Sequence, residues 1–137
     1  MLTNLIYTSK RCPECTEEEI DKILDVCQSN NSSKDITGVL LYSEDMFLQY
    51  LEGDRKELFG LYDKIKKDTR HRDTMMIGGV PISERIFPVW SMAKKNIGED
   101  GFRLISGGRK MDKQQFDGLL TDQENRYLVS SIKKFFS

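Results

Sequence analysis

The chain has 137 residues, a formal net charge of −1 and a pI near 5.9. A chain with this charge balance carries no general basic field for nucleic acid or for an anionic membrane surface. No apolar run approaches the roughly 18 residues that a membrane span requires, and three cysteines are too few and odd in number for a secreted disulfide framework. We therefore expect a globular cytoplasmic protein that binds neither nucleic acid nor membrane.

The chain begins with a strand pattern and a helix pattern. Residues 2–9 alternate between two faces, and Tyr7 shares a face with the apolar residue two positions earlier. Thr16, followed by three glutamates, is typical of a helix start, because acidic side chains favour the helix N-terminus. The apolar stripe of this helix reaches Asn31. The sequence therefore predicts that Tyr7 and Asn31 both face the core.

A hairpin, a second helix and two further strands follow. Two apolar runs, residues 36–42 and 47–53, flank a short polar turn and predict an antiparallel pair of strands. Asp54 has the position and chemistry of a helix N-cap. Residues 75–82 and 87–93 have strand patterns. The order β-α-β-β-α-β-β predicts an α+β, ferredoxin-like fold, in which a five-stranded sheet carries both helices on one face.

The C-terminal part has a weaker pattern. Glycines between residues 98 and 108 predict a loop, and residues 112–120 and 123–136 predict two helices. The aromatic-rich last helix would pack on the free face of the sheet or on another subunit. We therefore expect a domain over residues 1–96, an extension over residues 97–137, and a homo-oligomer.

Cys12 and Cys15 form a CxxC motif between the first strand and the first helix. Thioredoxin-like redox proteins have this arrangement, so a thiol-disulfide oxidoreductase is one alternative function. The glutamates at 17–19 oppose it, because nearby negative charge raises the pKa of a thiol. No nearby histidine or second CxxC completes a zinc site. We expect no metal and interpret both cysteines as loop residues.

Three polar side chains occupy positions that face the expected core. Tyr7 lies on the first strand, Asn31 ends the first helical stripe, and Gln49 lies in the middle of an apolar strand. Burying such groups without hydrogen-bond partners costs about 1–3 kcal/mol each. The three groups suit either a structural hydrogen-bond network or a flat ligand with polar edges. The chemistry of the residues alone leaves both interpretations open.

Five stretches of the sequence carry a resemblance to a known family. They are residues 30–31 (NN), 36–42 (ITGVLLY), 47–53 (FLQYLEG), 68–71 (DTRH) and 90–92 (WSM). In their order and spacing they resemble the BLUF domain, a blue-light sensor that uses a flavin, and the short tail is similar to that of stand-alone BLUF proteins. The resemblance implies a photoreceptor and not an enzyme. It also implies FAD as the cofactor, with FMN or riboflavin tolerated in the family, and a downstream signalling protein bound by protein–protein contact.

The resemblance also implies which residues contact the flavin. They are Tyr7, Ile23, Asn30, Asn31, Ile36, Gln49, Lys64, Ile65, Asp68 and Arg70. The isoalloxazine ring would lie between the two helices, with Asn31 bonded to its pyrimidine edge and Asn30 beside it. The three isoleucines would form apolar walls, and the charged residues would serve the ribityl-phosphate side. Family members have either arginine or lysine where this chain has Lys64.

The resemblance assigns the photoactive roles to four residues. Blue light would drive electron and proton transfer from Tyr7 to the flavin, and the amide of Gln49 would then rearrange and hydrogen-bond flavin O4. Trp90 and Met92, expected on the strand next to Gln49, would relay this change to the surface. A glutamine suits the task because the two ends of its amide are nearly equal in shape, so its hydrogen-bond pattern can reverse without a change in volume.

A colourless interaction domain of the same fold, one that has lost its ligand, is a second alternative to a flavin sensor. The presence of Tyr7, Asn31 and Gln49 argues against it. A yellow protein with a flavin absorption spectrum would exclude both this alternative and the oxidoreductase.

Overall fold

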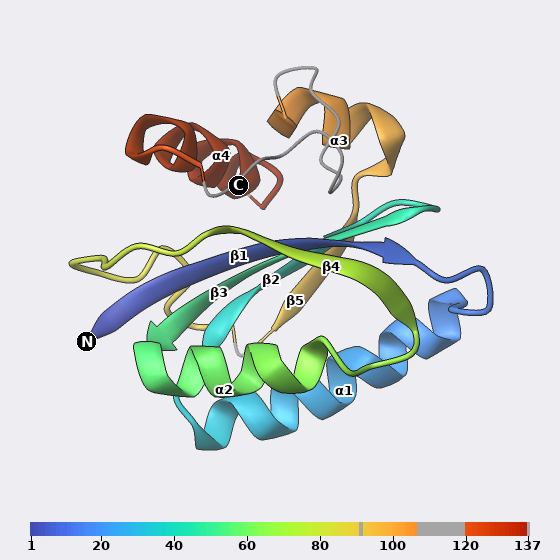
Figure 1. Ribbon diagram of the computed structural model, residues 1–137, viewed down its shortest axis with the longest axis horizontal. Helices are drawn as coiled ribbons and strands as arrows, with labels where there is room; N and C mark the ends of the chain where they lie inside the picture. Colours follow the sequence, from blue (N-terminus) through green and yellow to red (C-terminus); the bar gives the residue numbers. More distant parts are fainter. Residues whose placement is uncertain (91, 107–119, 137) are drawn as a thin grey trace.

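A five-stranded sheet separates two layers of helices in the computed structural model, which describes residues 1–90, 92–106 and 120–136 (Figure 1). The elements in chain order are β1 (Leu2–Arg11), α1 (Glu17–Ser33), β2 (Thr37–Tyr42), β3 (Met46–Asp54), α2 (Arg55–Ile65), β4 (His71–Gly78), β5 (Ala93–Asn96), α3 (Gly98–Ser106) and α4 (Asp122–Lys134). The predicted ferredoxin-like order, with two helices after the last strand, is confirmed.

The strand order across the sheet is β4-β1-β3-β2-β5. The predicted β2–β3 hairpin is antiparallel, and β5 lies parallel to β2 at one edge. The two central neighbours, β1 and β3, are antiparallel with Tyr7 opposite Gln49. This register brings two of the predicted core-facing polar residues into direct contact in the middle of the sheet.

Each face of the sheet has its own apolar core, because successive strand side chains point to opposite faces. On one face, Leu5 and Leu51 pack against α1 and α2. On the other, Ile6 and Tyr50 pack against a cluster that includes Ile132 of α4. In Figure 1, α1 and α2 accordingly lie on one side of the sheet, and α3 and α4 on the other.

Side-chain caps fix where three of the helices begin. Thr16 Oγ1 accepts a hydrogen bond from the Glu19 N–H at 3.3 Å, and an Asp54 carboxylate oxygen accepts one from the Lys56 N–H at 3.1 Å. Thr121 begins α4 with a full capping box. Among the described residues, no helix combines the length and apolar character that crossing a membrane requires.

The predicted bounds of the last strands are wrong. β4 covers His71–Gly78, not residues 75–82, because β1 extends to Arg11 and pairs with His71. The last strand is Ala93–Asn96, not residues 87–93. Residues before it leave the sheet, since the Phe87 N–H bonds a side-chain carboxyl and its ring joins the core on the α4 side.

The predicted glycine-rich loop is also partly wrong, because residues 98–106 form α3. Phe102 and Ile105 lie three residues apart and both pack into the core, so burial outweighs the low helix propensity of the glycines. Most of the helix predicted over residues 112–120 lies outside the described residues.

Gly38 of β2 lies so close to β3 that no side chain fits there. A Cβ atom at this position would be 2.1 Å from the backbone oxygen of Tyr50. We expect Gly38→Ala to push β2 away from β3 and to lower the free energy of unfolding by about 2 kcal/mol. Chemical denaturation followed by circular dichroism measures this change.

Gly60 is the matched control. It lies exposed in α2, and a Cβ atom there would meet nothing within 4 Å. Gly60→Ala should therefore raise the free energy of unfolding by about 0.5–1 kcal/mol, because alanine has the higher helix propensity. Similar effects of the two substitutions would contradict the close approach of β2 and β3.

Candidate functional site

A cavity of about 190 Å³ lies between α1, α2 and the sheet. Both the helices and the sheet contribute apolar and polar side chains to its walls. The residues that line it are Tyr7, Ile23, Val26, Cys27, Asn30, Asn31, Leu40, Phe47, Gln49, Leu61, Lys64, Ile65, Asp68, Arg70 and His71. An apolar slot with a few convergent polar groups suits a flat ligand with polar edges.

Regular spacing explains how distant parts of the sequence meet at this cavity. On α1, Ile23, Cys27 and Asn31 recur every four residues and so share one helix face. On the sheet, Tyr7 and Gln49 are direct cross-strand partners, and their side chains point to the α1 and α2 side. The cavity is thus built from one helix face and one sheet face.

A short chain of hydrogen bonds runs along the sheet side of the cavity. Tyr7 Oη donates to Gln49 Oε1 at 2.6 Å, and Gln49 Nε2 donates to Met92 Sδ at 3.4 Å. All three residues are buried. A thioether is a weak acceptor, so the amide is held strongly at its oxygen end and weakly at its nitrogen end.

The environment of Tyr7 keeps its phenol protonated. Burial raises the pKa of Tyr7 well above its usual value, and the nearby Cys27, Tyr62 and Asp68 raise it further. Ionisation would place a charge where water is excluded. Tyr7 therefore stays protonated at physiological pH, and its hydroxyl donates a hydrogen bond to the Gln49 oxygen.

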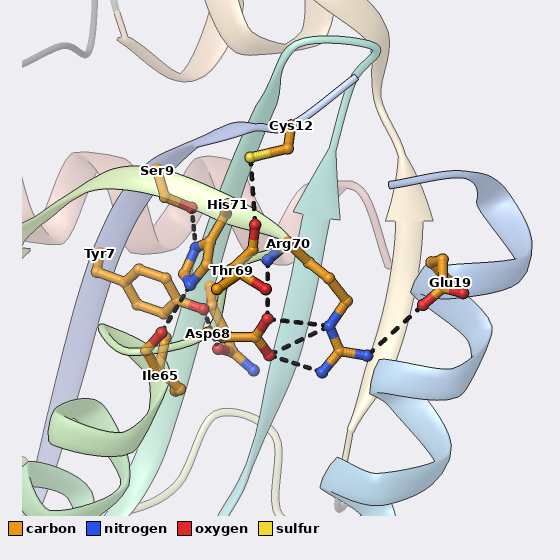
Figure 2. Close-up of polar contacts among 10 residues, drawn as sticks. Tyr7, Ser9, Cys12, Glu19, Ile65, Asp68, Thr69, Arg70 and His71 are labelled. Atoms are coloured by element: carbon orange, nitrogen blue, oxygen red, sulfur yellow. Dashed lines mark hydrogen bonds and ion pairs between the residues drawn. The ribbon is translucent and has the colours of Figure 1, made fainter. Parts of the chain in front are cut away.

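The cavity mouth carries a tight ion pair. Arg70 donates from Nη2 to Asp68 Oδ2 at 2.6 Å and from Nε to Oδ1 at 3.0 Å, and Glu19 lies 3.9 Å from its Nη1 (Figure 2). Hydrogen bonding from Arg70 lowers the pKa of Asp68, and the same contact raises the pKa of Arg70. Within the described ranges, Lys64 is the mouth cation with no ion pair. A ligand phosphate would meet one paired and one unpaired cation.

His71 closes the cavity between α2 and β1. Its Nε2 lies 2.7 Å from the backbone oxygen of Ile65, and its Nδ1 lies 2.7 Å from Ser9 Oγ (Figure 2). Because a carbonyl oxygen only accepts, Nε2 carries a proton. The ring meets the Tyr7 ring edge-on at 6.2 Å between centroids. His71 therefore fixes both the end of α2 and one side of Tyr7.

All the residues predicted to contact the flavin line this cavity except Ile36. Ile36 is buried in the core beside Gly53 instead, where its backbone N–H bonds the Asn31 oxygen. The prediction omitted six lining residues: Val26, Cys27, Leu40, Phe47, Leu61 and His71. Periodicity could have found several of them, since Cys27 lies between Ile23 and Asn31 on one stripe and Phe47 shares a strand face with Gln49.

The expected placement of Trp90 and Met92 on a strand beside Gln49 is wrong. Both residues precede β5, and β5 pairs with β2 and not with the strand of Gln49. Met92 nevertheless reaches Gln49 through its sulfur. Trp90 is 39% exposed, and its ring stacks on Phe87 at 5.7 Å between centroids, in the aromatic cluster on the α4 side. The two residues therefore contact opposite sides of the sheet.

The surroundings of Cys12 and Cys15 suit a structural role and not a redox role. Cys15 is buried, and burial raises its pKa, which opposes formation of a reactive thiolate. Cys12 donates from its sulfur to the Thr69 oxygen at 3.4 Å, and both thiols are free. Throughout the described part of the chain, no group of three or more histidine, cysteine or acidic residues could hold a metal. Nothing in this geometry favours the oxidoreductase alternative.

Sequence comparison places the chain in a family. Residues 2–93 match the family model described as BLUF, sensors of blue-light using FAD. The photoactivated adenylate cyclase subunit beta of Euglena longa is 35% identical over 92 residues, which are 66% of this chain and 11% of that protein. Subunit alpha of Euglena gracilis is 35% identical over 86 residues, 63% of this chain and 8% of that protein. The chain thus spans about a tenth of the length of these relatives.

Solved structures agree over nearly the whole chain. BlsA in its photo-activated state has a TM-score of 0.80 and 28% identity, with 97% of this chain and 95% of that chain covered. BlrB, a BLUF protein in its dark state, has a TM-score of 0.75 and 26% identity, with 98% and 96% covered. These matches define a light-sensing flavoprotein fold. The chain belongs to the BLUF family of flavin-binding blue-light sensors.

The hydroxyl of Tyr7 can be tested separately from its ring. Tyr7→Phe keeps the cavity wall but leaves Gln49 Oε1 without its donor, which should cost about 1–3 kcal/mol of folding free energy. Flavin should still bind, while the reversible red shift of the flavin spectrum under blue light should disappear. Absorption spectra before and after illumination measure both. A normal photocycle in this variant would exclude Tyr7 as the electron and proton donor.

Proposed function

We propose that the chain binds FAD in the cavity between α1 and α2 and senses blue light through Tyr7, Gln49 and Met92. The observation that carries this proposal is the buried hydrogen-bond chain from the Tyr7 hydroxyl through the Gln49 amide to the Met92 sulfur, at the wall of the cavity. Because the Gln49 amide contacts both Tyr7 and Met92, it would transmit a light-driven change at one of these residues to the other.

The lining residues suit each part of a flavin. Asn31, with Asn30 at the rim, offers a carboxamide to the polar edge of the ring. Ile23 and Ile65 come from facing helices and would cover the two sides of the ring. Ile36 is buried in the same apolar cluster as these two residues.

The outer groups of the cavity suit a ribityl-phosphate. Lys64 offers an ammonium that forms no ion pair with any described residue, and Arg70 is held in place by Asp68. The family description supports FAD. A solved relative, BlrP1 of Klebsiella pneumoniae, was obtained with FMN and cyclic diGMP, so we propose that the cavity also accepts the shorter flavin.

When bound, the flavin supplies the absorption of blue light and accepts an electron and a proton. Tyr7 would be the donor of both, because it is the buried phenol that lines the cavity, and its hydroxyl donates to Gln49 Oε1. In this proposal the Gln49 amide would then reverse, so that Nε2 would leave the Met92 sulfur and could donate to a polar group of the bound ligand. Because a thioether is a weak acceptor, breaking this contact costs little free energy.

The signal then passes to a partner protein. We propose that residues 1–96 form the sensor and that residues 97–137 form an extension through which the signal leaves. The aromatic contacts of Trp90 and Phe136 join the two parts. The cyclase subunits among the relatives support an effector protein as the partner, and we propose that the chain forms a homo-oligomer. Three free cysteines suit a reducing cytoplasm.

Gln49 provides the central test of this proposal. Gln49→Leu keeps the approximate volume but removes both the donor and the acceptor, so it tests switching and not packing. We expect a folded, yellow protein that is about 1–3 kcal/mol less stable, because Tyr7 loses its acceptor. The reversible red shift and the downshifted C4=O band in infrared difference spectra should both be absent.

The parent protein is the control and should show both signals after blue light and lose them in the dark. If Gln49→Leu retains both signals, the amide is structural and the proposed switch is wrong. A colourless parent protein would contradict flavin binding itself.

A further inference from the structure

Glu52 is a carboxyl group with no exposure to solvent on the same strand as Gln49. It lies three residues after Gln49, so its side chain points to the opposite face of the sheet. Its oxygens accept hydrogen bonds from the Ile86 N–H at 2.8 Å, the Phe87 N–H at 2.7 Å and the Tyr50 hydroxyl at 2.9 Å. Two of these donors belong to the connection between β4 and β5.

The beginning of this connection is therefore tied firmly to the sheet. Next to the Glu52 contacts, Arg85 donates to the Glu52 backbone oxygen at 3.1 Å, to Thr37 Oγ1 at 2.8 Å and to the Asp35 oxygen at 2.7 Å. Hydrogen bonds that involve charged groups and are shielded from water are the stronger ones in proteins. Residues 85–87 thus form a fixed point.

The end of the connection is held in a different way. Met92 receives the Gln49 amide at its sulfur at 3.4 Å and the Gln28 amide at its backbone oxygen at 2.9 Å. The sulfur contact is the one that a reversal of Gln49 removes. The Glu52 contacts do not involve this amide, so one end of the connection changes its contacts while the other keeps them.

Trp90 lies between these two ends. Its ring is nearly parallel to that of Phe87, with 18° between the planes and 5.7 Å between centroids. Phe136, beyond the end of α4, contacts both rings, at 5.8 Å from Phe87 and 5.4 Å from Trp90. Because Glu52 binds the backbone of Phe87, it sets the position of the ring on which Trp90 rests.

We propose that Glu52 is a positioning residue for signalling: it holds Phe87 still, so that the change at Gln49 and Met92 becomes a displacement of Trp90 relative to Phe87 and Phe136. This inference rests on the proposed reversal of Gln49. If Glu52 acts in this way, the connection between β4 and β5 has two arrangements, and its beginning is held in the same place in both. A signal passes between two sites through an element that has two such arrangements.

Glu52→Gln tests the proposal with little change in volume. The Ile86 N–H contacts both carboxylate oxygens, at 3.0 Å and 2.8 Å, so the NH₂ group of the new amide faces this N–H in either orientation, a donor meets a donor and the anchor is weakened. Two signals are recorded on the flavin-loaded protein: the red shift of the flavin, and the light-minus-dark change in the fluorescence of Trp90, which is the only tryptophan in the chain. We expect the red shift to be retained and the Trp90 change to fall at least severalfold.

Tyr50→Phe is the matched control, because it removes one hydrogen bond from Glu52 but leaves those of Ile86 and Phe87. It should retain both signals. Phe87→Leu keeps the backbone contacts with Glu52 but removes the ring beneath Trp90. This variant should retain the red shift and lose the fluorescence change of Trp90. It tests the inference if Glu52→Gln does not fold.

The outcomes separate this inference from the proposed function. An unchanged Trp90 signal in Glu52→Gln or in Phe87→Leu would overturn the inference, as would loss of the red shift in Glu52→Gln, because Glu52 would then act on the switch itself. Absence of the red shift in the parent protein would instead contradict the proposed function.

Discussion

The hydrogen bond between Tyr7 and Gln49 depends on the register of β1 and β3, and the rest of the site depends on that bond. The apolar neighbours Leu5 and Leu51 are cross-strand partners on the same face, so their burial fixes the same register. If one strand slipped by one residue, its polar group would turn to the other face and its leucine would leave the core. The core therefore enforces the contact on which the chemistry depends.

Strand β3 connects the cavity to the opposite helical layer. Gln49 faces α1 and α2, while Glu52 faces the layer of α3 and α4, because their positions differ by an odd number of residues. The connection between β4 and β5 meets both side chains. One strand thus presents the Gln49 amide to one face of the sheet and the Glu52 carboxyl to the other.

Sequence patterns predict those parts of the protein that local periodicity determines. Alternation and helical stripes were sufficient to place Tyr7, Asn31 and Gln49 toward the core. They were insufficient for Trp90 and Met92, because β5 is short and its position depends on parallel pairing with β2, a contact between segments distant in sequence. α3 was missed for a related reason, since burial of its apolar residues outweighs its glycines. The fine assignment of roles came from the family resemblance and not from the patterns.

The pairing of a tyrosine with a glutamine also explains how one site can have two arrangements of similar energy. A hydroxyl can donate or accept, and an amide has one end of each kind, so the two side chains can stay bonded when the amide reverses. Burial holds the pKa of Tyr7 high, so the hydroxyl keeps its proton and donates to the Gln49 oxygen. On the far side of the amide, the Met92 sulfur accepts weakly and therefore resists reversal little. A stronger acceptor at that position would hold the amide in its dark arrangement, and an apolar side chain there would leave the amide N–H₂ unsatisfied. In the proposed switch, a thioether would satisfy the amide in the dark and release it with little loss of free energy.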